Sequence, residues 1–384
     1  MGSSFGPSRG LRALSFGLSL AVSGVLVGSF SSGCAAAFDP PATVKTLRVF
    51  GAKVDKPYAK PGETVKIELL YYDASPKRFG ADGKPREIQI VWFGGCNNPT
   101  GDLYYGCFPI FGQIFASAVR PDGTFDPSKV PPGTLGGGSS RGPLRPEVFS
   151  QTLPADIISS RPPPSGTTIP YGVNYAFFAV CAGEIVPDPN GASGLPVSCR
   201  DPVTKAALGA DDFVFGYTSV YAYDTVENKN PVIDGRTFQD KLLDQTPCNE
   251  TTVCAEGSRC GFDTPRTCIP VIPHCTAEKL ADCPTYKFGP VMDAAKNSEF
   301  DANAIDSDGK TLQEVMWAYY YASDGTIAKD TRLINDAQAG WQDPAKFGTE
   351  WQAPGDASGP TRIWGVFHDN RGGAEWTWWD VYVD

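Results

Sequence analysis

The sequence predicts an all-β chain in which two β-sandwiches are joined by a small disulfide-rich insert. Aromatic residues are plentiful at 12%, and the 42 glycines and 34 prolines indicate many turns, a composition typical of short strands. Apolar and polar residues alternate in several segments, with the period of two of a strand that buries one face. Six cysteines lie within residues 248–283, a stretch with too few apolar residues for a core of its own.

Residues 1–34 have the layout of a secretory signal peptide. Arg9 and Arg12 precede an apolar stretch, and small residues lead to Cys34. A cysteine in this place resembles the lipobox of bacterial lipoproteins, which implies that Cys34 is acylated and becomes the new N-terminus. Ser31 stands where the preferred lipobox has Leu, so an ordinary cleaved signal and a retained membrane span remain alternatives. Residues 35–43 are predicted to be a short tether.

The number of cysteines favours export, and the net charge argues against a role in nucleic-acid binding. Setting Cys34 aside leaves ten of the 11 cysteines, an even number that allows five disulfides, and disulfides persist outside the cytosol. The formal charge of −10 becomes more negative when the basic leader is removed. An acidic surface repels phosphate backbones, so we expect no nucleic-acid partner.

The first sandwich is predicted over residues 44–228. Its strand candidates share alternation, nearby Pro-Gly turns or aromatic enrichment; they lie at 46–50, 65–72, 87–93, 173–181 and 213–223. Residues 95–170 are rich in Gly and Pro and are predicted to be a long insertion, mostly loop. Within it, the aromatic segment 103–119 is expected to pack over the sandwich edge. The alternative is an exposed apolar patch for a partner.

Ten cysteines are disulfide candidates. For Cys96, Cys107, Cys181 and Cys199 we favour the pairs 96–107 and 181–199 because the loops are short, with 96–181 as an alternative. The Cys-rich module, residues 246–285, holds the other six, and the sequence does not choose among their 15 pairings: Cys248, Cys254, Cys260, Cys268, Cys275 and Cys283. A zinc site is the rival interpretation, but no Cys-x-x-Cys pair is present, so disulfides are favoured.

The second sandwich is predicted over residues 286–384. One strand centres on Trp317, and residues 362–367 and 376–383 form a β-hairpin. On the last strand Trp376 and Trp378 face away from Trp379. We expect Trp379 in the core, with Trp376 and Trp378 shielded by a neighbouring domain or the insert. Otherwise these two form a flat platform for sugar rings or a protein partner.

These strands, with the turn at Lys60-Pro61-Gly62-Glu63 and the central Trp92 and Trp317, resemble bacterial Ig-like domains. They are similar to the Ig, PKD and cadherin-like group found in Gram-negative surface lipoproteins, and residues 246–285 loosely resemble EGF-like modules. No Cys pair flanks either tryptophan, unlike in true Ig domains. The resemblance implies adhesion, scaffolding or recognition. Sorting signals for inner-membrane retention often have Asp after the lipidated cysteine. Ala35 follows Cys34 instead, so we expect the protein to be sorted to the outer membrane or cell surface.

Signals for catalysis or metal binding are weak. The only histidines are His274 and His368, and no Gly-x-Ser-x-Gly elbow accompanies them. The acidic loop 301–309 fails the EF-hand spacing, although a nonstandard calcium site stays open. We therefore expect a noncatalytic envelope protein without cofactor, bound to a membrane by lipid and to another envelope protein or a glycan. The alternatives are a carbohydrate-binding module using Trp376 and Trp378, and a hydrolase with a loop-built site.

Overall fold

The structure is a computed structural model that describes residues 42–80, 83–120, 126–141, 147–161, 169–188, 196–243, 246–249, 251–261 and 266–384. The predicted signal peptide, Cys34 and nearly all of the tether lie outside these residues. The described regular structure is almost entirely strand, with the helices α1 (Phe108–Ala118) and α2 (Ala294–Asn297), so the predicted all-β class is confirmed. None of the described helices is both long and apolar enough to span a bilayer.

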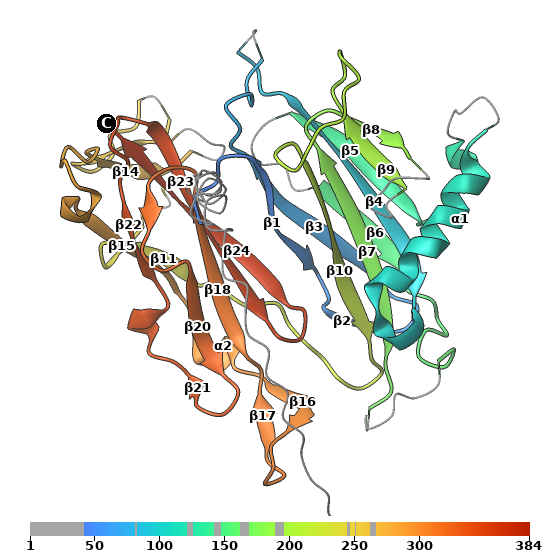
Figure 1. Ribbon diagram of the computed structural model, residues 1–384. Coiled ribbons are helices and arrows are strands. Elements are labelled where there is room, and N and C mark those ends of the chain that lie inside the picture. The colour runs from blue at the N-terminus through green and yellow to red at the C-terminus, as the bar shows by residue number, and fades with distance from the viewer. Residues whose placement is uncertain are drawn as a thin grey trace, which may run out of the picture. The chain divides into compact units, whose positions relative to one another are not determined.

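The first sandwich consists of two sheets (Figure 1). One has the order β1-β3-β6, with β1 Leu47–Val54, β3 Thr64–Asp73 and β6 Glu147–Thr152. The other has the order β2-β10-β7-β4-β5, with β2 Tyr58–Ala59, β10 Phe213–Ala222, β7 Gly172–Cys181, β4 Glu87–Asn97 and β5 Leu135–Arg141. Strands β1, β3 and β6 then match A, B and E of an Ig-like sandwich, and β4, β7 and β10 match C, F and G.

Trp92 organises the core of this sandwich. It lies on β4, is fully buried, stacks on Phe149 at 5.4 Å and meets Phe178 edge-on at 5.5 Å between ring centroids. A buried Trp on strand C is a hallmark of Ig domains, where it packs on a disulfide between strands B and F. Here aromatic rings from β6 and β7 take the place of that disulfide.

The prediction that residues 95–170 are an insertion that interrupts the sandwich needs correction. They supply β5 and β6, one strand to each sheet, and helix α1. The glycines that suggest a loop have a packing role, because a Cβ at Gly136 would lie 2.5 Å from the ring of Phe149. The expectation that segment 103–119 covers the sandwich is met by α1, which buries Phe111 and Phe115 against Phe93 on β4.

Two disulfides close short loops of the first sandwich, in the pairing that loop length favours. Cys96 is bonded to Cys107, 11 residues away, and Cys181 to Cys199, 18 residues away. The second bridge ties the end of β7 to the hairpin of β8 (Glu184–Pro187) and β9 (Val197–Arg200).

The second sandwich repeats the topology of the first. One sheet has the order β12-β11-β15-β22-β19, from β12 Lys241–Leu242, β11 Gly235–Phe238, β15 Thr285–Val291, β22 Thr349–Gln352 and β19 Thr326–Ile327. The other has the order β13-β14-β24-β23-β18-β20-β21, from β13 Ser258–Cys260, β14 Cys268–Ile272, β24 Ala374–Val383, β23 Gly359–Asp369, β18 Met316–Ala322, β20 Thr331–Asp336 and β21 Gly340–Trp341. β14 runs parallel to β24 as β2 does to β10.

The predicted boundaries of the second sandwich need correction. Strands β11 and β12 come before the Cys-rich module, and β14, which lies inside it, pairs with β24. The module is therefore an insertion within the second sandwich and not a linker that precedes it. These strands have two to five residues each, too short for alternation to reveal them. A separate hairpin of β16 (Phe300–Ile305) and β17 (Thr311–Gln313) also leaves the sandwich.

Trp317 does not occupy the core position that Trp92 holds. On β18 the buried side chains are Met316, Ala318, Tyr320 and Ala322, so Trp317 faces the other way and stacks on His368 at 5.9 Å. Tyr320 takes the core position instead, and its hydroxyl donates to the carbonyl of Phe347 at 2.6 Å. Trp351 and Trp379 complete this core.

The two sandwiches share a small apolar contact. Phe50 and Leu70 of the first sandwich pack against Trp364 and Val366 of the second. The ring centroid of Trp364 lies 4.8 Å from that of Phe50 and 4.7 Å from that of Tyr72. This contact covers the outer face of β23 and β24, which a lone sandwich would leave in water.

Candidate functional site

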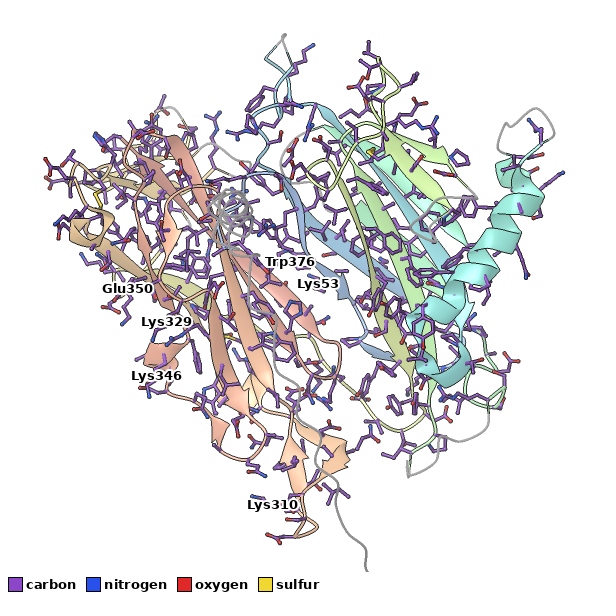
Figure 2. The ribbon with its side chains drawn as sticks, viewed as in Figure 1. Lys53, Lys310, Lys329, Lys346, Glu350 and Trp376 are labelled. Atoms are coloured by element: carbon purple, nitrogen blue, oxygen red, sulfur yellow. A yellow bond between two sulfur atoms is a disulfide. The ribbon has the colours of Figure 1, made fainter. Side chains whose placement is uncertain are left out.

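The predicted tryptophan platform lies beside this contact between the sandwiches. Trp376 and Trp378 are half-buried and pack against the cluster around Trp364. Lys53 of β1 lies 4.8 Å from the ring centroid of Trp376 (Figure 2), and Arg362 lies 5.2 Å from that of Trp378. Each indole is thus partly buried and has a cation of the protein over its ring, from the first sandwich for Trp376 and from the second for Trp378. This geometry fits the expectation that Trp376 and Trp378 are shielded, and it does not favour the alternative of an open platform for a sugar ring.

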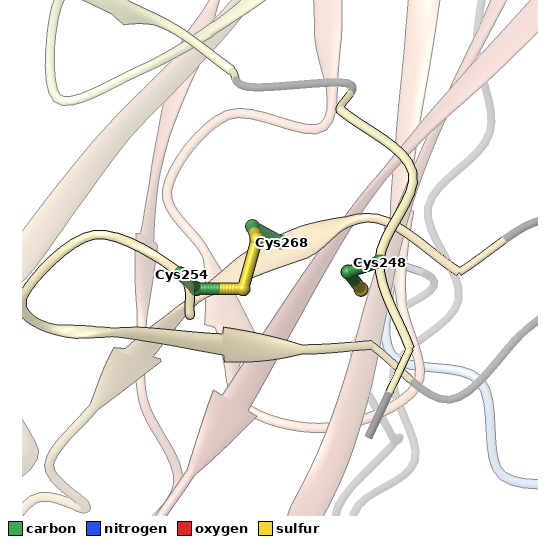
Figure 3. Close-up of side chains that lie close together, drawn as sticks. All are labelled: Cys248, Cys254 and Cys268. Carbon is green, nitrogen blue, oxygen red and sulfur yellow. A yellow bond between two sulfur atoms is a disulfide. The ribbon is translucent and has the colours of Figure 1, made fainter. Parts of the chain in front are cut away.

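The Cys-rich module is held by three bridges, Cys248–Cys260, Cys254–Cys268 and Cys275–Cys283. The sulfurs of Cys248, Cys254 and Cys268 lie within 4.8 Å of one another (Figure 3), the one such grouping of possible metal ligands in the described residues. Zinc binds thiolates, and each of these sulfurs is bonded to another sulfur. In this oxidised form the trio is a disulfide cluster without free ligands.

The acidic loop that left a calcium site open forms a hairpin turn. Asp306 accepts the amides of Asp308 and Lys310 at 2.9 Å each, and Gly309 has the positive φ of 80° that such a turn needs. Asp301 accepts the amide of Asn303 at 3.0 Å. Within the described chain these carboxylates do not gather with a third acidic group at ligand spacing.

The histidines have structural surroundings. Burial lowers the pKa of His368 to about 4, so this ring is neutral at physiological pH between Trp317 and Tyr319. The Nδ1 atom of His274 lies 2.6 Å from the carbonyl oxygen of Asp384. Asp369, next to His368, accepts backbone amides of Arg371 and Gly373 at 2.8 Å each. It shapes the β23–β24 turn and does not orient the imidazole.

The strongest candidate for a binding surface is an aromatic patch on the first sandwich. It comprises five partly exposed apolar side chains from η2 (Tyr104–Cys107), α1, β10 and the residue before η2. Their exposed fractions run from 37% to 53%, in Leu103, Tyr104, Tyr105, Ile110 and Tyr217. The sequence indicated this patch only as the alternative for segment 103–119, and it did not connect that segment with Tyr217, because β10 lies a hundred residues later.

Stacking aligns the rings of the patch. Tyr104 lies on Tyr217 with centroids 4.3 Å apart and planes 19° from parallel. Tyr217 in turn lies 5.6 Å from Phe177, a buried ring on β7. The exposed rings therefore rest on the sheet, which reduces the conformational entropy that binding would remove.

Asp102 fixes the segment that carries these rings. Its carboxylate accepts two bonds from the guanidinium of Arg161, at 2.9 and 3.1 Å, and one from the hydroxyl of Tyr171 at 2.6 Å. Its carbonyl accepts from Tyr175 at 2.7 Å, whose pKa burial raises to about 12, so this hydroxyl stays a donor. Together with the Cys96–Cys107 bridge, these bonds give the patch a rigid base.

A cavity lies beside the C-terminal half of α1, while the patch lies at its N-terminal end. Its volume is about 680 Å³, and its walls are mainly apolar, from Val91, Phe115, Leu135, Ile185 and Val197. Gln89 also lines it, and its side-chain oxygen Oε1 accepts a hydrogen bond from the backbone amide of Ile185 at 2.8 Å. Five elements distant in sequence build this cavity, so alternation within single strands could not predict it.

A buried ionic network joins the second sandwich to the first. Arg371, with 3% of its side chain exposed, donates to Glu314 at 2.8 and 3.0 Å and also to Glu299. Its guanidinium lies 5.7 Å from the ring of Tyr58 on β2. Burial raises the pKa of Glu314 to about 7, and the nearby Asp369 carboxylate adds to the rise.

Comparison with known proteins gives no family. No protein-family model matches the chain, and no curated protein matches it either. Among solved structures, red sea bream transglutaminase aligns at 8% identity over 89% of this chain and 32% of its own, with a TM-score of 0.18. Extracellular domains 3–5 of Drosophila OTK align at 10% identity over 90% and 99%, with a TM-score of 0.17. Tandem Ig repeats of Dlar align at 8% over 89% and 99%, with a TM-score of 0.18.

The chain thus spans about a third of the transglutaminase. TM-scores this low do not define a common fold, and the Ig-like description rests on the strand order.

Proposed function

We propose that this protein is a noncatalytic binding protein of the bacterial cell envelope that recognises a protein partner through the aromatic patch. The observation that carries the proposal is the gathering of five exposed apolar side chains on a base fixed by a disulfide and by Asp102. Exposed apolar patches on soluble proteins mark interaction sites when they are large. Tyrosine is enriched at protein interfaces, where its ring buries area at low entropic cost.

The mixture of side chains favours a protein partner over a glycan. Leu103, next to Tyr104 in the chain, and Ile110 on α1 add exposed aliphatic area, which suits an apolar protein surface better than a polar sugar ring.

Site-directed photocrosslinking in living cells tests this proposal. A photoreactive phenylalanine analogue replaces Tyr105, which is 53% exposed, and a control replaces Val203, which is 86% exposed in a loop outside the patch. We expect one discrete adduct from position 105 that Tyr217→Ser abolishes, and none from position 203. The absence of an adduct at 105, or identical adducts at both positions, would contradict the proposal.

Anchoring by lipid at Cys34 belongs to the same proposal. Disulfides throughout the described chain support export, and the resemblance of residues 31–34 to a lipobox supports acylation. Cys34→Ser should move the protein from the outer-membrane fraction to the soluble one. Unchanged membrane retention, or wild-type protein found only in the inner membrane, would count against the anchor or its location.

A further inference from the structure

A second cavity, of about 350 Å³, opens on the second sandwich. It lies between β15, the turn from β19 to β20, η5 (Pro344–Lys346) and β22. Three of its lining side chains are cationic, Lys287, Lys329 and Arg332, and one is anionic, Glu350. This local excess of positive charge contrasts with a chain whose formal charge is −10.

The backbone around the cavity is fixed by hydrogen bonds that leave charged groups available. The Nε atom of Arg332 donates to the carbonyl of Lys346 at 2.5 Å, which orients the guanidinium and leaves its two Nη atoms for another acceptor. The amide of Lys329 donates to the hydroxyl of Thr349 at 3.1 Å. In the described part of the chain, the ammonium group of Lys329 has no ion-pair partner, whereas Lys287 pairs with Asp240 at 2.8 Å.

Glu350 gives the cavity a second kind of chemistry. It lies on β22 directly opposite Lys287 in the strand register, and its exposed carboxylate can accept hydrogen bonds from hydroxyl groups. Lys329 and Arg332 are the cations that can still bind an anion, and Glu350 beside them is a hydrogen-bond acceptor. This combination matches a ligand that carries one anionic group and several hydroxyls. The size of the cavity falls in the range of small-molecule sites and suits one sugar residue.

We propose that this cavity binds an acidic sugar residue of a polysaccharide. Arg332 and Lys329 hold its anionic group, since a guanidinium fork matches carboxylate, sulfate or phosphate oxygens, and Glu350 accepts from its hydroxyls. Figure 2 shows Lys329, Lys346 and Glu350 along one side of the second sandwich, with Lys310 elsewhere on the β16–β17 hairpin. This site is separate from the aromatic patch, so the protein would bind a glycan and a protein partner on different sandwiches.

Equilibrium binding to the purified full chain tests the proposal with three oligosaccharides of equal length. One carries uronic acids, one carries sulfate esters, and one is neutral. We expect at least one charged probe to bind about tenfold more tightly than the neutral one and to weaken with added salt. The comparison between the two charged probes identifies the anionic group. Equal binding of all three probes, or no binding of either charged probe, would overturn the proposal.

Matched variants locate the binding. Lys329→Gln should weaken binding about fivefold to tenfold, whereas Lys310→Gln, the same charge change on an exposed hairpin residue, should leave it unchanged. Glu350→Gln should strengthen binding of the anionic probe a few-fold, because it removes a repelling charge and keeps an acceptor. Equal losses from Lys329→Gln and Lys310→Gln would show a general charge effect and refute the site. Tyr217→Ser should leave this binding intact, so the two proposals can fail separately.

Discussion

The substitution Glu314→Gln should make the protein more stable at alkaline pH and have little effect in acid. The side chain of Glu314 is 2% exposed, and it lies among Arg371, Glu299 and the Asp369 carboxylate. One guanidinium therefore faces several carboxylates in a site where Arg371 and Glu314 are buried and Glu299 is partly exposed. Burial raises the pKa of Glu314 from 4.5 to about 7, so the folded state favours the neutral carboxyl.

The sign and size of the effect follow from linkage. A folded-state pKa above the unfolded one gives stability that is fully present below pH 4.5 and is lost as pH rises through about 7. This shift corresponds to about 3 kcal/mol, because each pKa unit is worth about 1.4 kcal/mol. Glutamine stays neutral and still accepts from Arg371, so we expect the variant to exceed the wild type by about 3 kcal/mol at pH 8 and by less than about 1 kcal/mol at pH 5.

Urea denaturation followed by tryptophan fluorescence measures this difference. Seven of the eight tryptophans lie in the second sandwich, so the signal reports on the domain that holds Glu314. The exposed Glu278 supplies a control, and Glu278→Gln should change stability little at either pH. A difference between wild type and Glu314→Gln that is the same at pH 5 and pH 8, or a less stable variant at pH 8, would refute the reasoning.

Two further predictions concern stability. Replacing both Cys96 and Cys107 with serine should lower the free energy of unfolding of the first sandwich by about 3 kcal/mol, which is the loop-closure value for an 11-residue separation. Urea titrations under oxidising conditions measure this change, and an unchanged midpoint would contradict the prediction. Tyr320→Phe should cost about 1–2 kcal/mol by thermal or urea unfolding because it leaves the buried Phe347 carbonyl without its donor, and a neutral result would show that this bond adds nothing net.

Alternation predicted the strands that bury one face along their whole length. The run from Val65 to Tyr71 on β3 is an example: one side of the strand is buried against the core, so its apolar residues recur with a period of two. The closing hairpin was predicted for the same reason and forms as β23 and β24. The short-loop disulfides follow from geometry, because cysteines 11 or 18 residues apart at strand ends can meet without long-range folding.

Alternation was a poorer guide for strands whose composition is set by something other than one buried face. β5 contains Gly136 because the ring of Phe149 fills the place of a side chain, and its glycines suggested a loop. All ten residues of β7 are buried, since α1 covers its outer face, yet β7 was found because it is also apolar and aromatic. On β18 aromatic residues occur on both faces. The sequence therefore suggested Trp317 as the central residue, whereas the structure places Tyr320 in the core.

The sequence by itself determined the all-β class, the short-loop disulfides and the features that favour export, because each depends on local periodicity, residue spacing or composition. Only the tertiary structure decided which surfaces stay open. Trp376 and Trp378 pack against the apolar cluster that both sandwiches form. Tyr217 joins Tyr104 across a hundred residues, and Lys329, Arg332 and Glu350 line one cavity. The physical reason is that exposure is a property of the packed molecule: a side chain's own strand sets the direction it faces, and the segments that pack there, often distant in sequence, decide whether water reaches it.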